Sequence, residues 1–248
     1  MNIADQTFLI SGGGGSIGGY LCEHFYQEAK HIILLDRSEE ALKLIKERFP
    51  NVTTLVCDLT SGEAVDSAIK EVKASYNVSV LINNAGLIHS SPLVNLFDKE
   101  RGYHDFDMWD EVVRSNLYST FHLGAAVASS MAKSRTRGVI INISSIAAQG
   151  NMGQSAYSAA KAGIEALTVT WSKELGMFKI RCACIAPGFI DTPSTHASLN
   201  QATIENWKKS VPIGKLGPLE EIGKAVRYIV ESEYYNGKVL AIDGGLRI

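Results

Sequence analysis

Short, almost continuously apolar runs alternate along the chain with longer segments in which apolar residues recur every three or four positions. The apolar runs have the length of strands, and such continuous runs are typical of parallel strands buried on both faces. They predict strands at 7–11, 31–35, 52–56, 78–83, 138–143, 179–185 and 238–242. The periodic segments predict helices at 16–29, 38–48, 62–76, 107–134, 155–175 and 218–231.

This alternation of strand and helix predicts right-handed strand–helix–strand units. We therefore expect an α/β protein of the Rossmann type, with a doubly wound parallel sheet of about seven strands flanked by helices. No repeat, low-complexity segment or linker interrupts the pattern over the 248 residues. A chain of this length can bury one sizeable core, so we expect residues 1–248 to form a single domain.

Two connections are longer than compact α/β units need. Residues 87–106 separate the fourth strand from its helix, and residues 187–217 contain several Pro and Gly around one short helical piece with Trp207. Both follow the carboxyl end of a strand, where open α/β sheets bind ligands. We expect them to form the walls of a substrate pocket, with 187–217 as its lid. The alternative is that both are surface loops.

Composition and charge narrow the class of protein. The net charge is −2, without the surplus of Lys and Arg that nucleic-acid binding requires. No apolar run has the length of a membrane span, and the first residues do not resemble a signal peptide. Four scattered cysteines indicate neither a disulfide scaffold nor a metal site. We therefore expect a cytoplasmic protein with no nucleic-acid, membrane or metal partner.

A glycine cluster joins the first predicted strand to the first predicted helix. Residues 11–19 read S-G-G-G-G-S-I-G-G. Glycines at such a junction permit a tight turn and a close approach of the backbone to a pyrophosphate, which binds at the helix N-terminus. The strand–turn–helix context predicts a dinucleotide site at this loop.

Asp36, at the end of the second strand, bears on the choice of dinucleotide. It follows the glycines by about twenty residues, where a carboxylate accepts hydrogen bonds from a ribose 2′-hydroxyl and repels a 2′-phosphate. The glycine loop contains no Lys or Arg to hold such a phosphate. We therefore favour NAD(H) over NADP(H). Arg37 leaves NADP(H) as the alternative, because its guanidinium can stack on adenine or hold a phosphate.

A tyrosine and a lysine stand four residues apart in the predicted helix 155–175. Tyr157 and Lys161 would lie on one face of that helix, one turn apart. A nearby ammonium lowers the pKa of a phenol, and a tyrosine tuned toward neutral pH can act as a general acid or base. The same spacing also occurs by chance in amphipathic helices. Ser144 is the serine that we expect beside Tyr157, while Ser145 is expected to point to the other side of the strand.

Several motifs together resemble those of the short-chain dehydrogenase/reductase family. The glycine loop is similar to the family's T-G-x-x-x-G-I-G, with Ser11 in place of Thr and Ser16 where the middle Gly is usual. Three further segments match family motifs: residues 83–86 (N-N-A-G), 186–192 (A-P-G-F-I-D-T) and 242–245 (I-D-G-G). These motifs occur in the family's order over essentially the whole chain.

The resemblance implies an NAD(P)-dependent enzyme that interconverts a ketone and a secondary alcohol by hydride transfer. It implies that Ser144 and Tyr157 hold the substrate oxygen, with Tyr157 transferring the proton. Lys161 would bind the nicotinamide ribose, and Asn116 would anchor a water that links Lys161 to solvent. The implied cofactor contacts are Ser11, Gly12, Gly15, Ser16, Ile17, Gly18, Asp36, Arg37, Asp58, Leu59, Asn84, Ala85, Gly86, Tyr157, Lys161, Pro187, Gly188, Ile190 and Thr192.

Within the family, residues 150–163 and 211–226 look most like 3-oxoacyl-(acyl carrier protein) reductases. The 87–106 loop and the C-terminal residues look more like NAD-dependent 3-hydroxyacyl-CoA dehydrogenases. The resemblance therefore implies a carrier- or CoA-linked 3-oxoacyl or 3-hydroxyacyl thioester, or a similar small carbonyl compound, as substrate. It also implies a homotetramer, or a homodimer, built on helices 107–134 and 155–175.

Other functions remain open at this point. A non-catalytic nucleotide sensor could share the fold, although it would not need to keep Asn116, Ser144, Tyr157 and Lys161 together. A sugar, polyol or small-ketone dehydrogenase of the same family would share every motif. A sugar-nucleotide epimerase needs a large C-terminal substrate domain, whereas only 60 residues follow Gly188.

Overall fold

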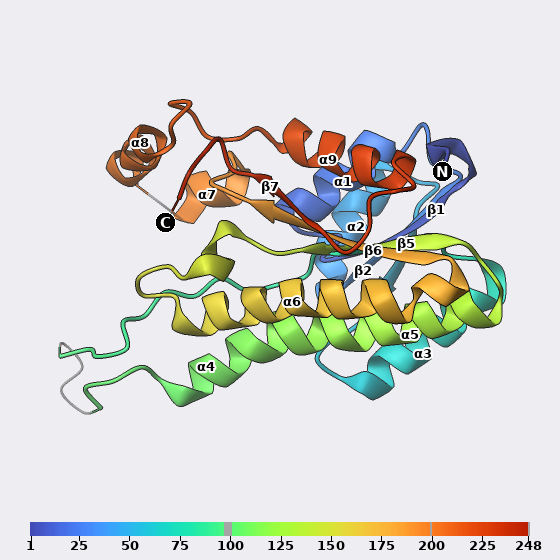
Figure 1. Ribbon diagram of the computed structural model, residues 1–248, viewed down its shortest axis with the longest axis horizontal. Coiled ribbons are helices and arrows are strands. Elements are labelled where there is room, and N and C mark those ends of the chain that lie inside the picture. The colour runs from blue at the N-terminus through green and yellow to red at the C-terminus, as the bar shows by residue number, and fades with distance from the viewer. Residues whose placement is uncertain (97–100, 199, 248) are drawn as a thin grey trace.

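A parallel sheet forms the centre of the protein. The computed structural model describes residues 1–96, 101–198 and 200–247, and within them the strand order is β3-β2-β1-β4-β5-β6-β7 (Figure 1). All neighbouring strands are parallel, which confirms the predicted Rossmann-type α/β fold. The strands are β1 (Thr7–Ser11), β2 (His31–Asp36), β3 (Thr53–Val56), β4 (Val80–Asn83), β5 (Gly138–Ile143), β6 (Ile180–Pro187) and β7 (Val239–Ile242).

Helices cover both faces of this sheet because the strands are apolar on both sides. In β1, Phe8 and Ile10 pack into one buried cluster and Leu9 into the other. The first cluster lies under α1 (Ser16–Phe25), α2 (Glu39–Arg48) and α9 (Leu219–Glu231). The second lies under α3 (Gly62–Ser75), α5 (Ser119–Lys133) and α6 (Ser155–Glu174) (Figure 1).

The chain is helical over nearly all of the predicted segment 107–134, but it is not one continuous α-helix, and the sequence did not predict the interruption. The chain forms α4 (Phe106–Val113), a π-helical segment (Arg114–Tyr118) and then α5. Asn116 lies in the π-helical segment, and its Nδ2 donates to Val112 O and to Leu87 O, both at 2.8 Å. The amide of Asn116 thus competes with backbone N–H groups for carbonyl acceptors such as Val112 O. Such π-helical segments are frequent at functional sites.

The segment 187–217 also has more structure than predicted. It contains α7 (Pro193–Ser198) and α8 (Gln201–Ser210) instead of one short helical piece. The remaining elements are short 3₁₀ turns at Ile3–Asp5, Ile146–Gln149 and Gly176–Phe178. None of the helices in the described part of the chain is long and apolar enough to cross a membrane.

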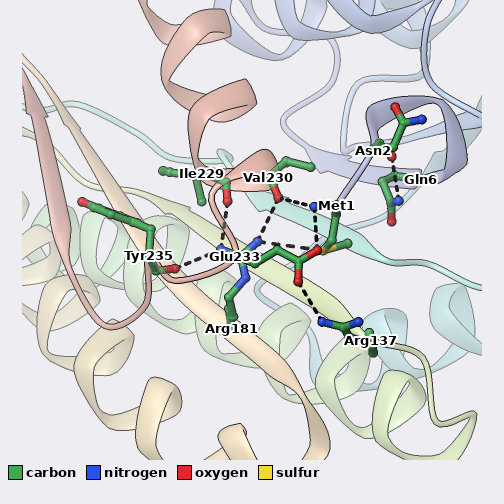
Figure 2. Close-up of polar contacts among 9 residues, drawn as sticks. All are labelled: Met1, Asn2, Gln6, Arg137, Arg181, Ile229, Val230, Glu233 and Tyr235. Atoms are coloured by element: carbon green, nitrogen blue, oxygen red, sulfur yellow. Dashed lines mark hydrogen bonds and ion pairs between the residues drawn. The ribbon is translucent and has the colours of Figure 1, made fainter.

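Arg181 joins β6 to the C-terminal end of α9. Its Nη1 donates to Ile229 O at 2.8 Å and to Tyr235 O at 2.9 Å, and its Nη2 donates to Val230 O at 3.0 Å (Figure 2). The last carbonyls of a helix have no partner within the helix, and a cation there is stabilising. Burial lowers the pKa of the Arg181 guanidinium. This partly buried cation thus ties the end of the helix to the sheet.

Candidate active site

A cavity of about 690 Å³ opens at the carboxyl ends of the strands, beside the point between β1 and β4 where the strand order reverses. Its volume is that of a typical ligand site. Most of the predicted cofactor contacts line it. They are Gly12, Gly15, Ser16, Ile17, Asp36, Arg37, Asp58, Leu59, Asn84, Ala85, Gly86, Tyr157, Lys161, Pro187, Gly188, Ile190 and Thr192.

Two predicted cofactor contacts, Ser11 and Gly18, are not among the lining residues. The hydroxyl of Ser11 accepts hydrogen bonds from the backbone N–H groups of Asn84 and Ala85, at 2.9 and 3.0 Å. A Cβ at Gly18 would lie only 2.1 Å from Gly12 O. Ser11 therefore ties the glycine loop to the end of β4, and Gly18 permits the close turn of the loop. Neither residue lines the cavity.

The nucleotide end of the cavity has the donors and acceptors that a dinucleotide needs. Gly15 caps α1 without a side-chain hydrogen bond, so the first N–H groups of this ten-residue helix are available to an anion. Asp36 lies beside the same loop, where its Oδ2 accepts from Gly14 N at 2.9 Å and its Oδ1 from Ser38 N at 3.0 Å. A helix N-terminus and a fixed carboxylate match a pyrophosphate and a ribose hydroxyl. The residues present therefore fit a nicotinamide dinucleotide.

Tyr157 and Lys161 lie on one face of α6, as predicted from their spacing. Lys161 Nζ is 5.5 Å from the centre of the Tyr157 ring and donates to Ile143 O at 2.9 Å. Both side chains are buried, and burial raises the pKa of Tyr157 to about 12 and lowers the pKa of Lys161 to about 8. The predicted lowering of the phenol pKa by Lys161 is not found: burial raises the pKa of Tyr157, and the smaller opposing effect comes from Ser145.

The two serines after β5 have the opposite orientation from the one predicted. Ser144 faces α6, donating to Glu165 Oε1 at 3.0 Å and lying 3.2 Å from Lys161 O. Ser145 instead lies on the side of Tyr157, where its hydroxyl lowers the pKa of the phenol against the larger effect of burial. The expectation that Ser144 lies beside Tyr157 is therefore wrong.

The strand pattern explains this reversal. Ser144 N donates to Ile185 O at 2.8 Å, so the ladder between β5 and β6 continues one residue beyond the strand. Ser144 consequently points to the same side as Asn142, whose Nδ2 donates to Thr168 of α6 at 2.9 Å. Ser145 then turns into the cavity as the N-cap of the 3₁₀ turn that follows.

Asn116 completes the group. Its Oδ1 is buried and has no hydrogen-bond partner within the described residues. A Cβ at Gly86 would lie 2.4 Å from this oxygen and 3.5 Å from Lys161 Nζ. The absence of a side chain at Gly86 therefore keeps Asn116 and Lys161 close together. Of the four predicted catalytic residues, the structure gathers Asn116, Tyr157 and Lys161, with Ser145 in the place expected for Ser144.

Known proteins with similar sequences identify the family. The family model described as "short chain dehydrogenase" matches residues 6–203. The chain belongs to the short-chain dehydrogenase family. A 3-oxoacyl-[acyl-carrier-protein] reductase of Chlamydia trachomatis is 35% identical over 98% of each chain, and one of Thermotoga maritima is 35% identical over the whole of both chains. The reductase of that name from Escherichia coli is 31% identical over 99% of each chain.

Sequence reasoning did not identify the residues that form the substrate half of this short-chain dehydrogenase cavity. The long connections 87–106 and 187–217 indicated where some of them would lie, but the residues just before Tyr157 gave no separate signal. These lining residues are Leu87, Ile88, Ser90, Ser145, Ile146, Ala147, Asn151, Met152, Gln154, Phe189, Ser194, Thr195 and Trp207.

Ser16 is one of the two residues at which this short-chain dehydrogenase departs from the family's glycine loop. It is the first residue of α1, and its hydroxyl lies 3.2 Å from the hydroxyl of Ser194 on α7. Ser194 is also hydrogen-bonded to Thr192 at 2.9 Å. The hydroxyl of Ser16 therefore joins the glycine loop to the 187–217 segment. A glycine at this position has no side chain with which to make that contact.

Proposed function

We propose that this protein is an NAD(H)-dependent oxidoreductase that interconverts a 3-oxoacyl thioester and the corresponding 3-hydroxyacyl thioester. The family makes it a ketone/alcohol oxidoreductase. The observation that carries the proposal is the meeting of Ser145, Tyr157 and Lys161 in one cavity with a fixed carboxylate, Asp36, at its nucleotide end. Relatives named 3-oxoacyl-[acyl-carrier-protein] reductase support the thioester as substrate class.

The side chains of this site have separable tasks in such a reaction. Tyr157 transfers a proton to or from the substrate oxygen, and Ser145 holds that oxygen by a hydrogen bond. Lys161, with a pKa of about 8, can hold or release a proton near neutral pH beside the phenol. The unpaired Oδ1 of Asn116 offers an acceptor next to the amine. The nicotinamide, when bound, supplies or accepts the hydride.

The preference for NAD(H) is also a proposal, and Asp36 supports it. Its carboxylate is fixed by two backbone N–H groups at the edge of the cavity, so a 2′-phosphate would meet a negative charge. Fluorescence titration with NADH and NADPH measures the preference without any substrate. We expect tighter binding of NADH, and a smaller difference between the two in Asp36→Ser. Tighter binding of NADPH by the unaltered protein would contradict the proposal.

Turnover of a substrate panel tests the proposed reaction. NADH oxidation would be followed with 3-oxoacyl thioesters, simple ketones and keto sugars under identical conditions. We expect the thioesters to give the largest kcat/KM. A sugar or simple ketone as the best substrate would replace the proposed substrate class. Binding of NADH without turnover of any compound would instead favour a nucleotide sensor.

A further inference from the structure

The substrate half of the cavity carries no charge within the described part of the chain. Four charged side chains line the whole cavity. Asp36, Arg37 and Asp58 belong to the nucleotide end, and Lys161 is buried under Tyr157. A carboxylate or phosphate on the substrate would lose hydration here without gaining a cationic partner, which is strongly unfavourable. The part of the substrate that lies inside this half is therefore uncharged.

The amide groups in the same half are already paired with each other. Gln154 Nε2 donates to Ser90 Oγ at 3.0 Å, and Asn151 Nδ2 donates to Gln154 Oε1 at 2.9 Å. A backbone hydrogen bond from Ser91 N to Gly153 O, at 2.7 Å, joins the same two segments. These groups hold the chain after β4 against the turn before α6. The hydroxyl groups of a sugar would have to displace these hydrogen bonds to gain partners of their own.

Two large apolar side chains lie at the rim of this half and are exposed. Ile88 is 66% exposed and Met152 is 97% exposed, yet both line the cavity. Exposed apolar side chains at the edge of a site mark a surface that becomes covered on binding. The unbranched thioether of Met152 can adapt its shape to a flexible ligand.

A flat apolar surface lies in the same cavity. The rings of Phe189 and Trp207 are stacked, with centroids 4.0 Å apart and an interplanar angle of 9°. Both residues line the cavity. The substrate half thus combines a flat aromatic surface with two exposed apolar side chains at its rim.

We propose that Ile88 and Met152 form a subsite for the apolar acyl chain of the substrate and set a preference for longer chains. This inference rests on the proposed function, because it assumes that the ketone next to Tyr157 belongs to a 3-oxoacyl group. A short acyl chain ends inside the cavity. A longer one reaches the rim and covers both side chains. Each methylene removed from water contributes about 0.8 kcal/mol, which is about fourfold in kcat/KM.

A chain-length series tests the subsite. Neutral N-acetylcysteamine thioesters of 3-oxo acids with four, six, eight and ten carbons would be reduced with NADH. We expect kcat/KM to rise with chain length, by up to about fourfold per methylene. In Met152→Ser and Ile88→Ser the ratio of kcat/KM for ten carbons to that for four carbons should fall several-fold. Both side chains are exposed, so the melting temperature should not change.

Met177→Ser is the matched control. Met177 is also exposed, at 82%, but it precedes β6 at the opposite end of the sheet and does not line the cavity. Its chain-length ratio should equal that of the unaltered protein. Equal kcat/KM for all four thioesters, or ratios in Met152→Ser and Ile88→Ser that match the control, would overturn the subsite while leaving the proposed function standing. Failure to reduce any thioester would overturn the proposed function itself.

Discussion

Ser145 and Ser144 are neighbours in the sequence but contact different partners. Ser145 faces the Tyr157 phenol and lowers its pKa, whereas Ser144 is buried against Glu165 and Lys161 of α6. The two hydroxyls are therefore separable by mutation. We propose that Ser145 binds the substrate oxygen and that Ser144 positions the helix that carries Tyr157 and Lys161.

Replacing each serine by alanine distinguishes these roles. Ser145→Ala should lower kcat by about 100-fold or more, the typical effect of losing a hydrogen-bond donor to a reacting oxygen. Ser144→Ala should lower kcat less than tenfold and reduce the free energy of unfolding by about 1 kcal/mol, because a buried hydrogen bond is lost. Steady-state kinetics and urea unfolding measure the two effects. The reverse order of activities would show that Ser144 is the catalytic serine.

The buried amine of Lys161 makes stability depend on pH. Its pKa falls from 10.5 in the unfolded chain to about 8 in the folded protein. The unfolded chain therefore binds the proton more tightly, and the folded state gains stability as the pH rises from about 8 to 10.5. Below this interval burial of the charge costs about 3 kcal/mol. The loss of stability is the consequence of burying the Lys161 amine next to Tyr157.

Lys161→Met should remove that cost. At pH 7 the variant should be more stable than the unaltered protein by up to about 3 kcal/mol, and the difference should narrow as the pH approaches 10. Comparison of the two proteins cancels the titration of the buried cysteines and Tyr157. Urea unfolding at pH 7 and pH 10 provides the measurement. A stability difference that does not change with pH would contradict the assignment of this pKa to Lys161.

At the scale of the elements, the packing of the end of α9 against β6 depends on Arg181. Arg181→Met keeps the length of the side chain but leaves the carbonyls of Ile229 and Tyr235 without their donor, while Val230 O keeps only the N-terminal amine of Met1 at 3.4 Å (Figure 2). We expect the free energy of unfolding to fall by about 2–4 kcal/mol. The control is Lys224→Met on the same helix, where an exposed lysine forms a surface ion pair with Glu221 and the urea midpoint should not move. Equal effects of the two substitutions would show that Arg181 is not what fixes α9.

The elements also show which features a sequence can predict. The run G-V-I-I-N-I is buried at every position, and the predicted strand 138–143 has the bounds of β5. Periodicity indicates which residues are buried, but it does not indicate how far the hydrogen-bonded ladder between β5 and β6 continues. The end of this ladder determines to which side Ser144 and Ser145 point. The π segment depends on the bond from Asn116 to Leu87, which is 29 positions away and absent from any local pattern. Similarly, the pKa of Tyr157 depends on burial by distant segments.

At the scale of the whole molecule, we propose a homotetramer or homodimer that buries the outer surfaces of α5 and α6. Phe121 of α5 is 48% exposed, Val169 of α6 is 39% exposed, and Tyr118 just before α5 is 47% exposed. Phe121→Glu would place a charge in such an interface. Light scattering should show an oligomer for the unaltered protein and smaller species for the variant. A monomer in both samples would contradict the proposed assembly.

The central claim is that Tyr157 transfers the proton in a nicotinamide-dependent reduction of a ketone. Tyr157→Phe retains the ring, which packs beside Val112, Ala147 and Ala156, and removes only the hydroxyl. The decisive measurement combines NADH binding with the rate of 3-oxoacyl thioester reduction in this variant. We expect the dissociation constant for NADH to stay within about threefold and kcat to fall by about 100-fold or more. Turnover close to that of the unaltered protein would contradict this account of the site.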